Sequence, residues 1–94
     1  MKYLTFWEFS PEDMDKVIKK FAEYQKELEK NPDKYQTYLY PPHAFGGETK
    51  GFSIVEATPE QMVENVLYWT PLLRMKYKAI VASAKIAQQY LKPK

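Results

Sequence analysis

Three side chains of this sequence have the right chemistry for proton transfer: Glu8, Glu56 and His43. The two glutamates lie 48 residues apart, and each follows a strand-like run and precedes a helix start. Two carboxylates held close together and partly buried would raise the pKa of one of them, which would give a general acid or base. Alternatively, both are solvated strand ends that complement the positive N-termini of the helices.

His43 is the only histidine and therefore the only side chain whose ordinary pKa lies near neutrality. Residues 43–50 contain two glycines and follow two prolines, so we expect a loop, where functional residues concentrate. A catalytic His43 and a merely exposed His43 both fit this pattern. Gly46 and Gly47 lack the longer phosphate-binding pattern, so they indicate only a turn.

Aromatic rings with polar tips form a second group of candidates. In a cavity they would bind a flat organic ligand. In a subunit interface they would simply hold two copies together, because tyrosine and tryptophan are enriched there. The only arginine is a candidate for bidentate contacts to an anion, with a plain surface position as the alternative. The candidate ligand-binding residues are Tyr3, Trp7, Tyr38, Tyr40, Trp69 and Arg74, and Tyr77 belongs to the same group of rings.

Length and composition exclude several classes of function. A chain of 94 residues predicts a single domain over 1–94. The net charge of +2 comes from 14 basic and 12 acidic residues, so no basic face for nucleic acid is expected. The absence of cysteine and the single histidine argue against a metal site, and no motif indicates a cofactor. No apolar run approaches the ~18 residues of a membrane span, so we expect a cytoplasmic protein without a membrane partner.

An internal repeat indicates the architecture. The run Leu4–Glu8 and the following Ser10-Pro11 match Phe52–Glu56 and Thr58-Pro59. Each copy reads as a strand, a capped turn and a helix, and Gln61 completes a capping box in the second copy. The alternation over residues 2–9 predicts the first strand, and the first helix should run from Met14 to about Asn31.

The other segments complete a ferredoxin-like α+β order. A short strand over 36–40 should end at Pro41-Pro42, because proline cannot donate to a sheet ladder. Strands are predicted over 51–57 and 73–81 and a last helix over 83–91, whose Ile86, Ala87, Tyr90 and Leu91 should face inward. The result is β-α-β-β-α-β with an extra C-terminal helix.

This order predicts which strands meet. We expect the first and third strands to be central, adjacent and parallel, so that Glu8 and Glu56 lie side by side, with Cα atoms about 5 Å apart. The apolar set should face the helices: Leu4, Phe6, Phe52 and Ile54. The opposite, open face would then carry Tyr3, Thr5, Trp7, Ser53 and Val55. Such a face is too apolar for water, so we expect a homodimer or a cavity there.

The sequence also resembles a family of small proteins, domain-of-unknown-function family 3303. The resemblance rests on Thr5-Phe6-Trp7-Glu8-Phe9, on Gly51-Phe52-Ser53-Ile54-Val55-Glu56 and on the histidine after the second strand, His43. A helix ending near Trp69, followed by Leu72-Leu73, is similar as well. The resemblance implies a dimeric α/β-barrel fold and carries no established activity.

Two functions fit these observations. One is a homodimeric α/β-barrel domain that binds a small hydrophobic or aromatic ligand between the sheets. The alternative, by analogy of fold, is an enzyme similar to cofactor-independent monooxygenases and isomerases. In either case a small-molecule site should lie between the open sheet face and the loop from Tyr40 to Gly51, with His43 near Trp7 and Tyr38.

Overall fold

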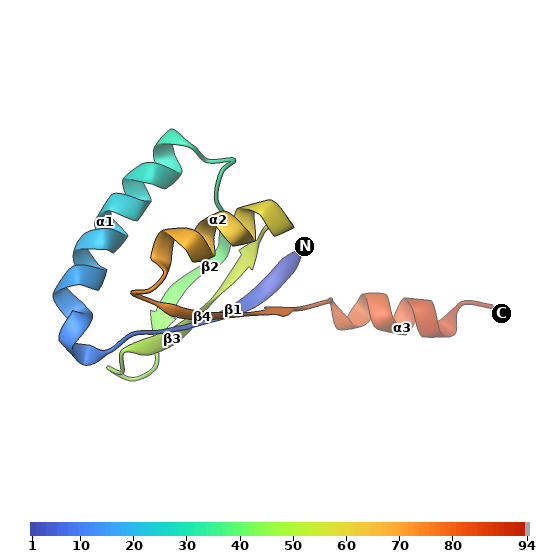
Figure 1. Ribbon diagram of the computed structural model, residues 1–94. Helices are drawn as coiled ribbons and strands as arrows, with labels where there is room; N and C mark the ends of the chain where they lie inside the picture. The colour runs from blue at the N-terminus through green and yellow to red at the C-terminus, as the bar shows by residue number, and fades with distance from the viewer. Residues whose placement is uncertain (94) are drawn as a thin grey trace.

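The computed structural model describes residues 1–93 and shows two helices on one face of a four-stranded sheet (Figure 1). A third helix extends from the end of the sheet. The elements are β1 (Lys2–Glu8), a short 3₁₀ turn (Pro11–Asp13), α1 (Met14–Lys30), β2 (Thr37–Ala44), β3 (Lys50–Glu56), α2 (Pro59–Trp69), β4 (Arg74–Ala79) and α3 (Ser83–Leu91). This is the expected ferredoxin-like order with an extra C-terminal helix.

The sheet has the strand order β2-β3-β1-β4, and every neighbouring pair is antiparallel. The first and third strands are therefore adjacent, as expected, but the prediction that they are parallel is wrong. The α1 crossover makes β2 run parallel to β1, and the hairpin then inserts β3 between them in the opposite direction. The two halves of the repeat are thus related by a rotation that places equivalent residues at opposite ends of the sheet.

Only one of the two predicted helix caps forms, the one in the second copy of the repeat. At the start of α2 the Gln61 amide donates to the Thr58 hydroxyl at 3.2 Å, and the Thr58 amide donates to the Gln61 side chain at 2.9 Å. This is the predicted capping box. Ser10 makes no side-chain cap; its carbonyl accepts from the Asp13 amide at 2.9 Å and closes the 3₁₀ turn before α1.

Strand β2 continues through the two prolines that were expected to stop it. Its register against β3 shifts between Tyr38 and Tyr40 and again between Tyr40 and His43. Because β2 is an edge strand, these irregularities turn the prolines away from the ladder without breaking the strand. The expected loop from residue 43 is correspondingly shorter, since His43 and Ala44 belong to β2.

The two faces of the sheet are the reverse of the prediction. Thr5, Ser53 and Val55 are buried beneath the helices, whereas Phe6 is 38% exposed on the open face. Large rings with polar tips fill the core: Tyr24 of α1, Trp69 of α2 and Tyr35 from the connection between α1 and β2. Small residues on the sheet leave room for those rings, which explains why the bulky apolar set of β1 and β3 faces outward.

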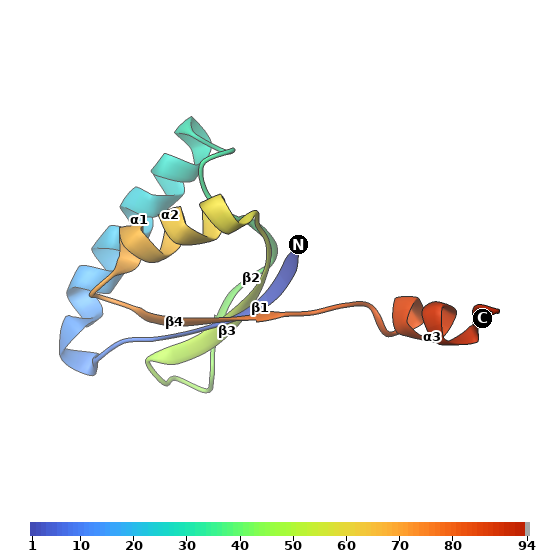
Figure 2. The same cartoon turned by 45° about the vertical axis from the view of Figure 1, so that its right-hand side comes forward.

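Helix α3 projects away from the rest of the chain in both ribbon views (Figures 1 and 2). None of its residues is buried, so the prediction that one side faces inward is wrong within this chain. The short connection over residues 80–82 leads α3 off the end of the sheet rather than back onto it. No helix within residues 1–93 is long and apolar enough to cross a membrane.

Candidate functional site

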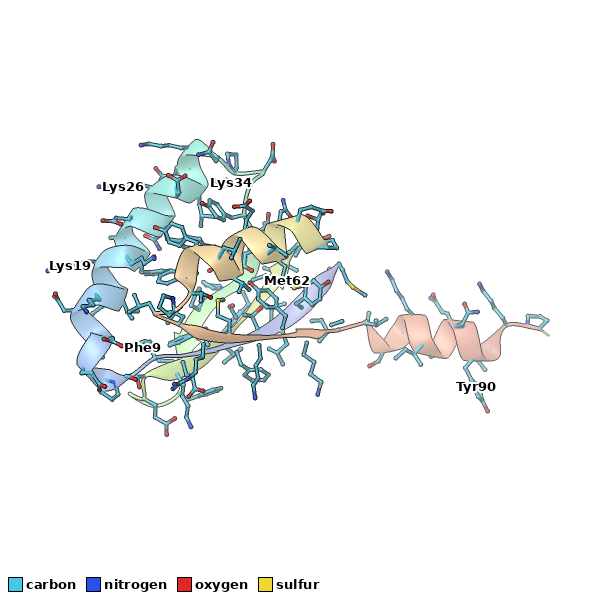
Figure 3. All side chains as sticks on the ribbon, viewed as in Figure 1. Phe9, Lys19, Lys26, Lys34, Met62 and Tyr90 are labelled. Carbon is cyan, nitrogen blue, oxygen red and sulfur yellow. The ribbon has the colours of Figure 1, made fainter. Side chains whose placement is uncertain are left out.

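A cavity of about 300 Å³ lies between α1, the end of α2 and the helix-covered face of the sheet. Helix α1 contributes Val17, Ile18 and Phe21 to its wall. Ile18 is 59% exposed, so the cavity opens to solvent beside it. The outer side of α1 is polar, and Figure 3 shows Lys19 and Lys26 pointing away from the sheet. The amphipathic helix thus presents apolar side chains to the cavity and polar ones to water.

The other walls come from the sheet and from the end of α2. The remaining lining residues are Trp7, Phe9, Tyr38, Pro42, Ala44, Ser53, Trp69, Leu73 and Met75. Apolar and aromatic groups predominate, with the hydroxyls of Tyr38 and Ser53 and the indole of Trp7 as polar points. This combination of a mainly apolar wall with a few fixed polar groups is typical of small-molecule sites.

Trp7, one of the lining residues, has a buried indole N–H without a hydrogen-bond acceptor in the described part of the chain. Its indole stacks on Phe9, with ring centroids 6.1 Å apart and planes 9° from parallel. The ring also lies against Gly51, where an added Cβ would come within 2.5 Å of Trp7 Cζ2. Its Nε1 is buried and has no hydrogen-bond partner within residues 1–93. A buried N–H without an acceptor costs about 1–3 kcal/mol.

Behind the cavity lies a buried network of hydroxyls and amides. Tyr24 donates its hydroxyl proton to Asn65 Oδ1, and Asn65 Nδ2 donates to the Tyr77 hydroxyl at 2.9 Å. The Tyr77 hydroxyl donates to Gln36 Oε1 at 2.6 Å. Gln36 Nε2 donates to the Tyr38 hydroxyl at 3.3 Å. Since Tyr38 also lines the cavity, the network orients one of its polar groups.

Burial sets the protonation state of this network. Desolvation raises the pKa of Tyr24, Tyr38 and Tyr77 above the ordinary value. For Tyr24 the neighbouring Tyr38 hydroxyl raises it further, and for Tyr77 the Asn65 hydrogen bond lowers it in part. All three phenols are therefore neutral hydrogen-bonding groups at physiological pH and do not supply a base.

The structure brings three of the six candidate ligand-binding residues together. Trp7, Tyr38 and Trp69 all line the cavity. Tyr3 instead packs edge-on against Tyr77, with centroids 5.7 Å apart, and lies outside the lining. Tyr40 lies at the β2 side of the sheet and stacks on Phe52 at 5.7 Å.

The two glutamates do not form a pair, so that prediction is wrong. In the register of β1 with β3, Glu8 lies opposite Lys50 and Glu56 lies opposite Lys2, at the two ends of the strands. Glu8 accepts an ion pair from Arg74 Nε at 3.3 Å, and both side chains are about half exposed or more. Arg74 and Glu8 also border a second hollow of about 470 Å³, whose rim carries further exposed charges from Lys50 and Lys76.

His43 is exposed and lies next to Tyr40. Its ring stacks on Tyr40 at 4.4 Å, and its Nδ1 lies 2.6 Å from the Pro41 carbonyl oxygen, to which it can donate. It is not among the residues that line the apolar cavity. The candidate cavity therefore lies on the helix-covered side of the sheet, away from the position expected for a His43-centred site.

One comparison with known proteins is informative. The model of a family described as a domain of unknown function (DUF3303) matches residues 1–93. This chain belongs to the DUF3303 family. No curated protein and no solved structure matches it. The cavity and the polar network of this DUF3303 domain are therefore interpreted from their own geometry.

The sequence analysis missed most of the polar network of this DUF3303 domain. Asn65 lies between Met62 and Trp69, at the spacing of the inward side of α2, and it is fully buried. A lone amide at such a position signals a buried hydrogen-bond network. Gln36 gave no comparable signal, because it precedes β2 and only the fold brings it to Tyr77.

Proposed function

We propose that this DUF3303 domain is a homodimeric subunit that binds a small, mainly apolar or aromatic molecule between α1 and the sheet. The observation that carries the proposal is the cavity of about 300 Å³ with its mainly apolar and aromatic wall, to which Trp7, Tyr38 and Trp69 contribute rings. Aromatic rings in the wall favour a flat ligand.

The open face of the sheet supports the homodimer. Leu4, Phe6, Phe52 and Ile54 lie there as cross-strand neighbours on β1 and β3. Tyr40 and Phe45 stack on Phe52 and extend this apolar surface. The reversed faces thus leave a more apolar surface open than the sequence analysis expected. A face of this kind is normally covered, and two copies related by a two-fold axis would cover each other's.

Binding accounts for the cavity better than acid–base catalysis does. Among its lining residues within the described chain there is no carboxylate, histidine, lysine or arginine. The three candidate catalytic residues, Glu8, His43 and Glu56, are exposed and lie outside it. No observation favours the enzymatic alternative in the same specific way.

The proposal is tested by ligand binding to the full chain. Native mass spectrometry of freshly purified protein should show an additional small molecule per subunit. Titration with 2-naphthol, a flat probe with one oxygen acceptor, should show saturable binding by calorimetry. Trp7→Phe removes one of the two indole rings from the wall, so it should weaken 2-naphthol binding by up to about tenfold, because an aromatic pair contributes about 0.5–1.5 kcal/mol.

A matched control is Tyr68→Phe, which removes a hydroxyl from a ring of α2 that does not line the cavity. It should leave 2-naphthol binding unchanged. If the parent protein carries no copurified molecule and shows no saturable 2-naphthol binding, the proposed binding function is wrong.

A further inference from the structure

Helix α3 has no packing partner within its own chain. All nine residues over Ser83–Leu91 are exposed, and the ribbon views show the helix beyond the end of the sheet (Figures 1 and 2). Isolated helices shorter than about 12–15 residues are marginal in water even for favourable sequences. A stable α3 therefore requires a surface from another molecule.

The exposed apolar residues of α3 lie mainly on one side. Ile86 and Tyr90 are one helical turn apart and are 62% and 83% exposed. Figure 3 shows the Tyr90 side chain pointing to the side of the molecule opposite α1 and α2, which is the side of the open sheet face. One partner that covers the open face would therefore also face this side of α3.

The open face offers a limited area for an interface. Four strands spaced about 4.8 Å apart, each about seven residues long at 3.3 Å per residue, cover a flat footprint on the order of 450 Å². Specific interfaces bury about 800 Å² of accessible surface per partner, a quantity that exceeds the flat footprint of the same face. Contact with α3 and with the exposed Val81 before it would enlarge a dimer interface through the sheet by further apolar surface.

We infer that α3 is an arm with which each subunit contacts the other. In the homodimer it packs on the partner subunit through Ile86 and Tyr90. The inference rests on the homodimer proposed above and adds to it a specific role for the C-terminal helix. The occupant of the apolar side of α3 is a second copy of this chain.

The first experiment measures whether the arm contacts its own chain or another copy. The chain has no cysteine, so Gln88→Cys allows a single nitroxide spin label on the side of α3 opposite Ile86 and Tyr90. Spin-labelled protein without isotope is mixed with ¹⁵N-labelled parent protein. Amide signals from the sheet and helices of the ¹⁵N copy should broaden in the mixed dimer.

A second sample separates the alternatives. It carries spin label and ¹⁵N on the same chain, diluted with unlabelled parent protein. Broadening of distant amides only in this sample would show that α3 folds back on its own chain, and broadening beyond α3 in neither sample would show a free arm. Either result overturns the inference.

The second experiment measures the contribution of the arm to dimerisation. Ile86→Asp combined with Tyr90→Asp should raise the dimer dissociation constant at least tenfold in sedimentation velocity. The matched control, Ala84→Asp combined with Gln88→Asp, introduces the same charge on the other side of α3 and should change this constant less than twofold. A dimer that tolerates the first pair equally well contradicts the role of α3, whereas a monomeric parent chain contradicts the homodimer itself.

Discussion

At the scale of single residues, the core of this protein depends on one amide. Asn65 connects two tyrosines from different elements, Tyr24 of α1 and Tyr77 of β4. Helix α1 contacts the sheet across a cavity, so this hydrogen-bonded link is one of the contacts that hold α1 in place. Because buried polar groups are costly when unpaired, the network specifies one arrangement of the two helices.

Removing one hydroxyl from this network should therefore destabilise the fold. Tyr24→Phe keeps the buried ring and leaves Asn65 Oδ1 without its donor. We expect a loss of about 1–3 kcal/mol in the free energy of unfolding, the cost of an unsatisfied buried acceptor. Urea denaturation followed by tryptophan fluorescence measures it. Tyr68→Phe, which removes a hydroxyl that takes no part in this network, serves as control, and an equal effect of both variants would contradict the assigned role.

The raised tyrosine pKa values predict a loss of stability in alkaline solution. In the unfolded chain the phenols ionise near pH 10, whereas in the folded protein burial keeps Tyr24 and Tyr77 protonated above that pH. The folded state then binds more protons, so the free energy of unfolding falls as the pH rises above about 10. Below that pH the two states hold the same protons and these groups contribute no slope.

Urea titrations at pH 8, 9.5, 10.5 and 11.5 check this sign. Lysines titrate in the same range, so the informative quantity is the difference between the parent and Tyr77→Phe. The parent should lose more stability than the variant between pH 9.5 and 11.5. A variant with the same slope would show that Tyr77 ionises at its ordinary pKa in the folded protein.

At the scale of elements, the pairing of β2 with β3 depends on Gly51. It lies between Ala44 of β2 and Trp7 of β1 in the register. A Cβ at this position would collide with the His43 carbonyl oxygen and lie 2.5 Å from Trp7 Cζ2. Backbone groups cannot move aside as a flexible side chain can, so the close approach of the bulged β2 strand requires glycine here.

Gly51→Ala should therefore cost more stability than the same change in open space. Gly46 has φ +42° and no atom within 4 Å of an added Cβ, so Gly46→Ala should cost only about 1 kcal/mol. For Gly51→Ala we expect more than 2 kcal/mol, the range of overpacking in a close-packed site. Thermal unfolding of the two variants side by side gives the comparison, and equal melting temperatures would refute the packing argument.

Local patterns in the sequence identified the elements but not how they face each other. The helix over Met14–Lys30, the Thr58 cap with Gln61 and the last helix over Ser83–Leu91 follow from short-range spacing and are confirmed. The direction of β3 depends on the hairpin with β2, and no single strand encodes it. The faces of β1 and β3 were reversed because the covered side carries the polar Thr5 and Ser53 whereas the central residues of the open side are all apolar, so alternation alone indicated the wrong core side.

The candidate site was likewise predicted only in part from local sequence patterns. Rings at Trp7, Tyr38 and Trp69 were predicted as ligand-binding residues, and the fold does gather them at one cavity. The polar partners behind them come from segments far apart in the sequence, such as Gln36 and Tyr77. Side-chain contacts of this range depend on the tertiary fold, which is why residue types alone predicted a site on the side of the sheet opposite to this cavity.

At the scale of the whole molecule, one face of the sheet is covered by helices and the other is open. The covered face holds the aromatic core and the cavity, and the open face carries Leu4, Phe6, Phe52 and Ile54. A domain of 94 residues has a thin core, so covering the open face would add substantially to its stability. Dimerisation through that face should therefore be coupled to folding stability.

A charge on the open face tests this coupling. Phe6 lies at the centre of β1 opposite Phe52, and Phe6→Asp would bury a carboxylate in the proposed interface. Light scattering after gel filtration should give twice the 11.1 kDa chain mass for the parent and the single mass for the variant. The melting temperature of the parent should rise with protein concentration, and that of the variant should not.

The control for this prediction is Leu67→Asp, which places the same charge on the outer side of α2, where Leu67 is 66% exposed. This variant should remain a dimer, and its melting temperature should rise with protein concentration as that of the parent does. The reason is that Leu67 lies on the helix side of the molecule, opposite to the open face. If Leu67→Asp dissociates the dimer and Phe6→Asp does not, the subunits meet through the helices. In that case the open aromatic face must be covered by something other than a second copy, and both the interface and the arm derived from it would be wrong.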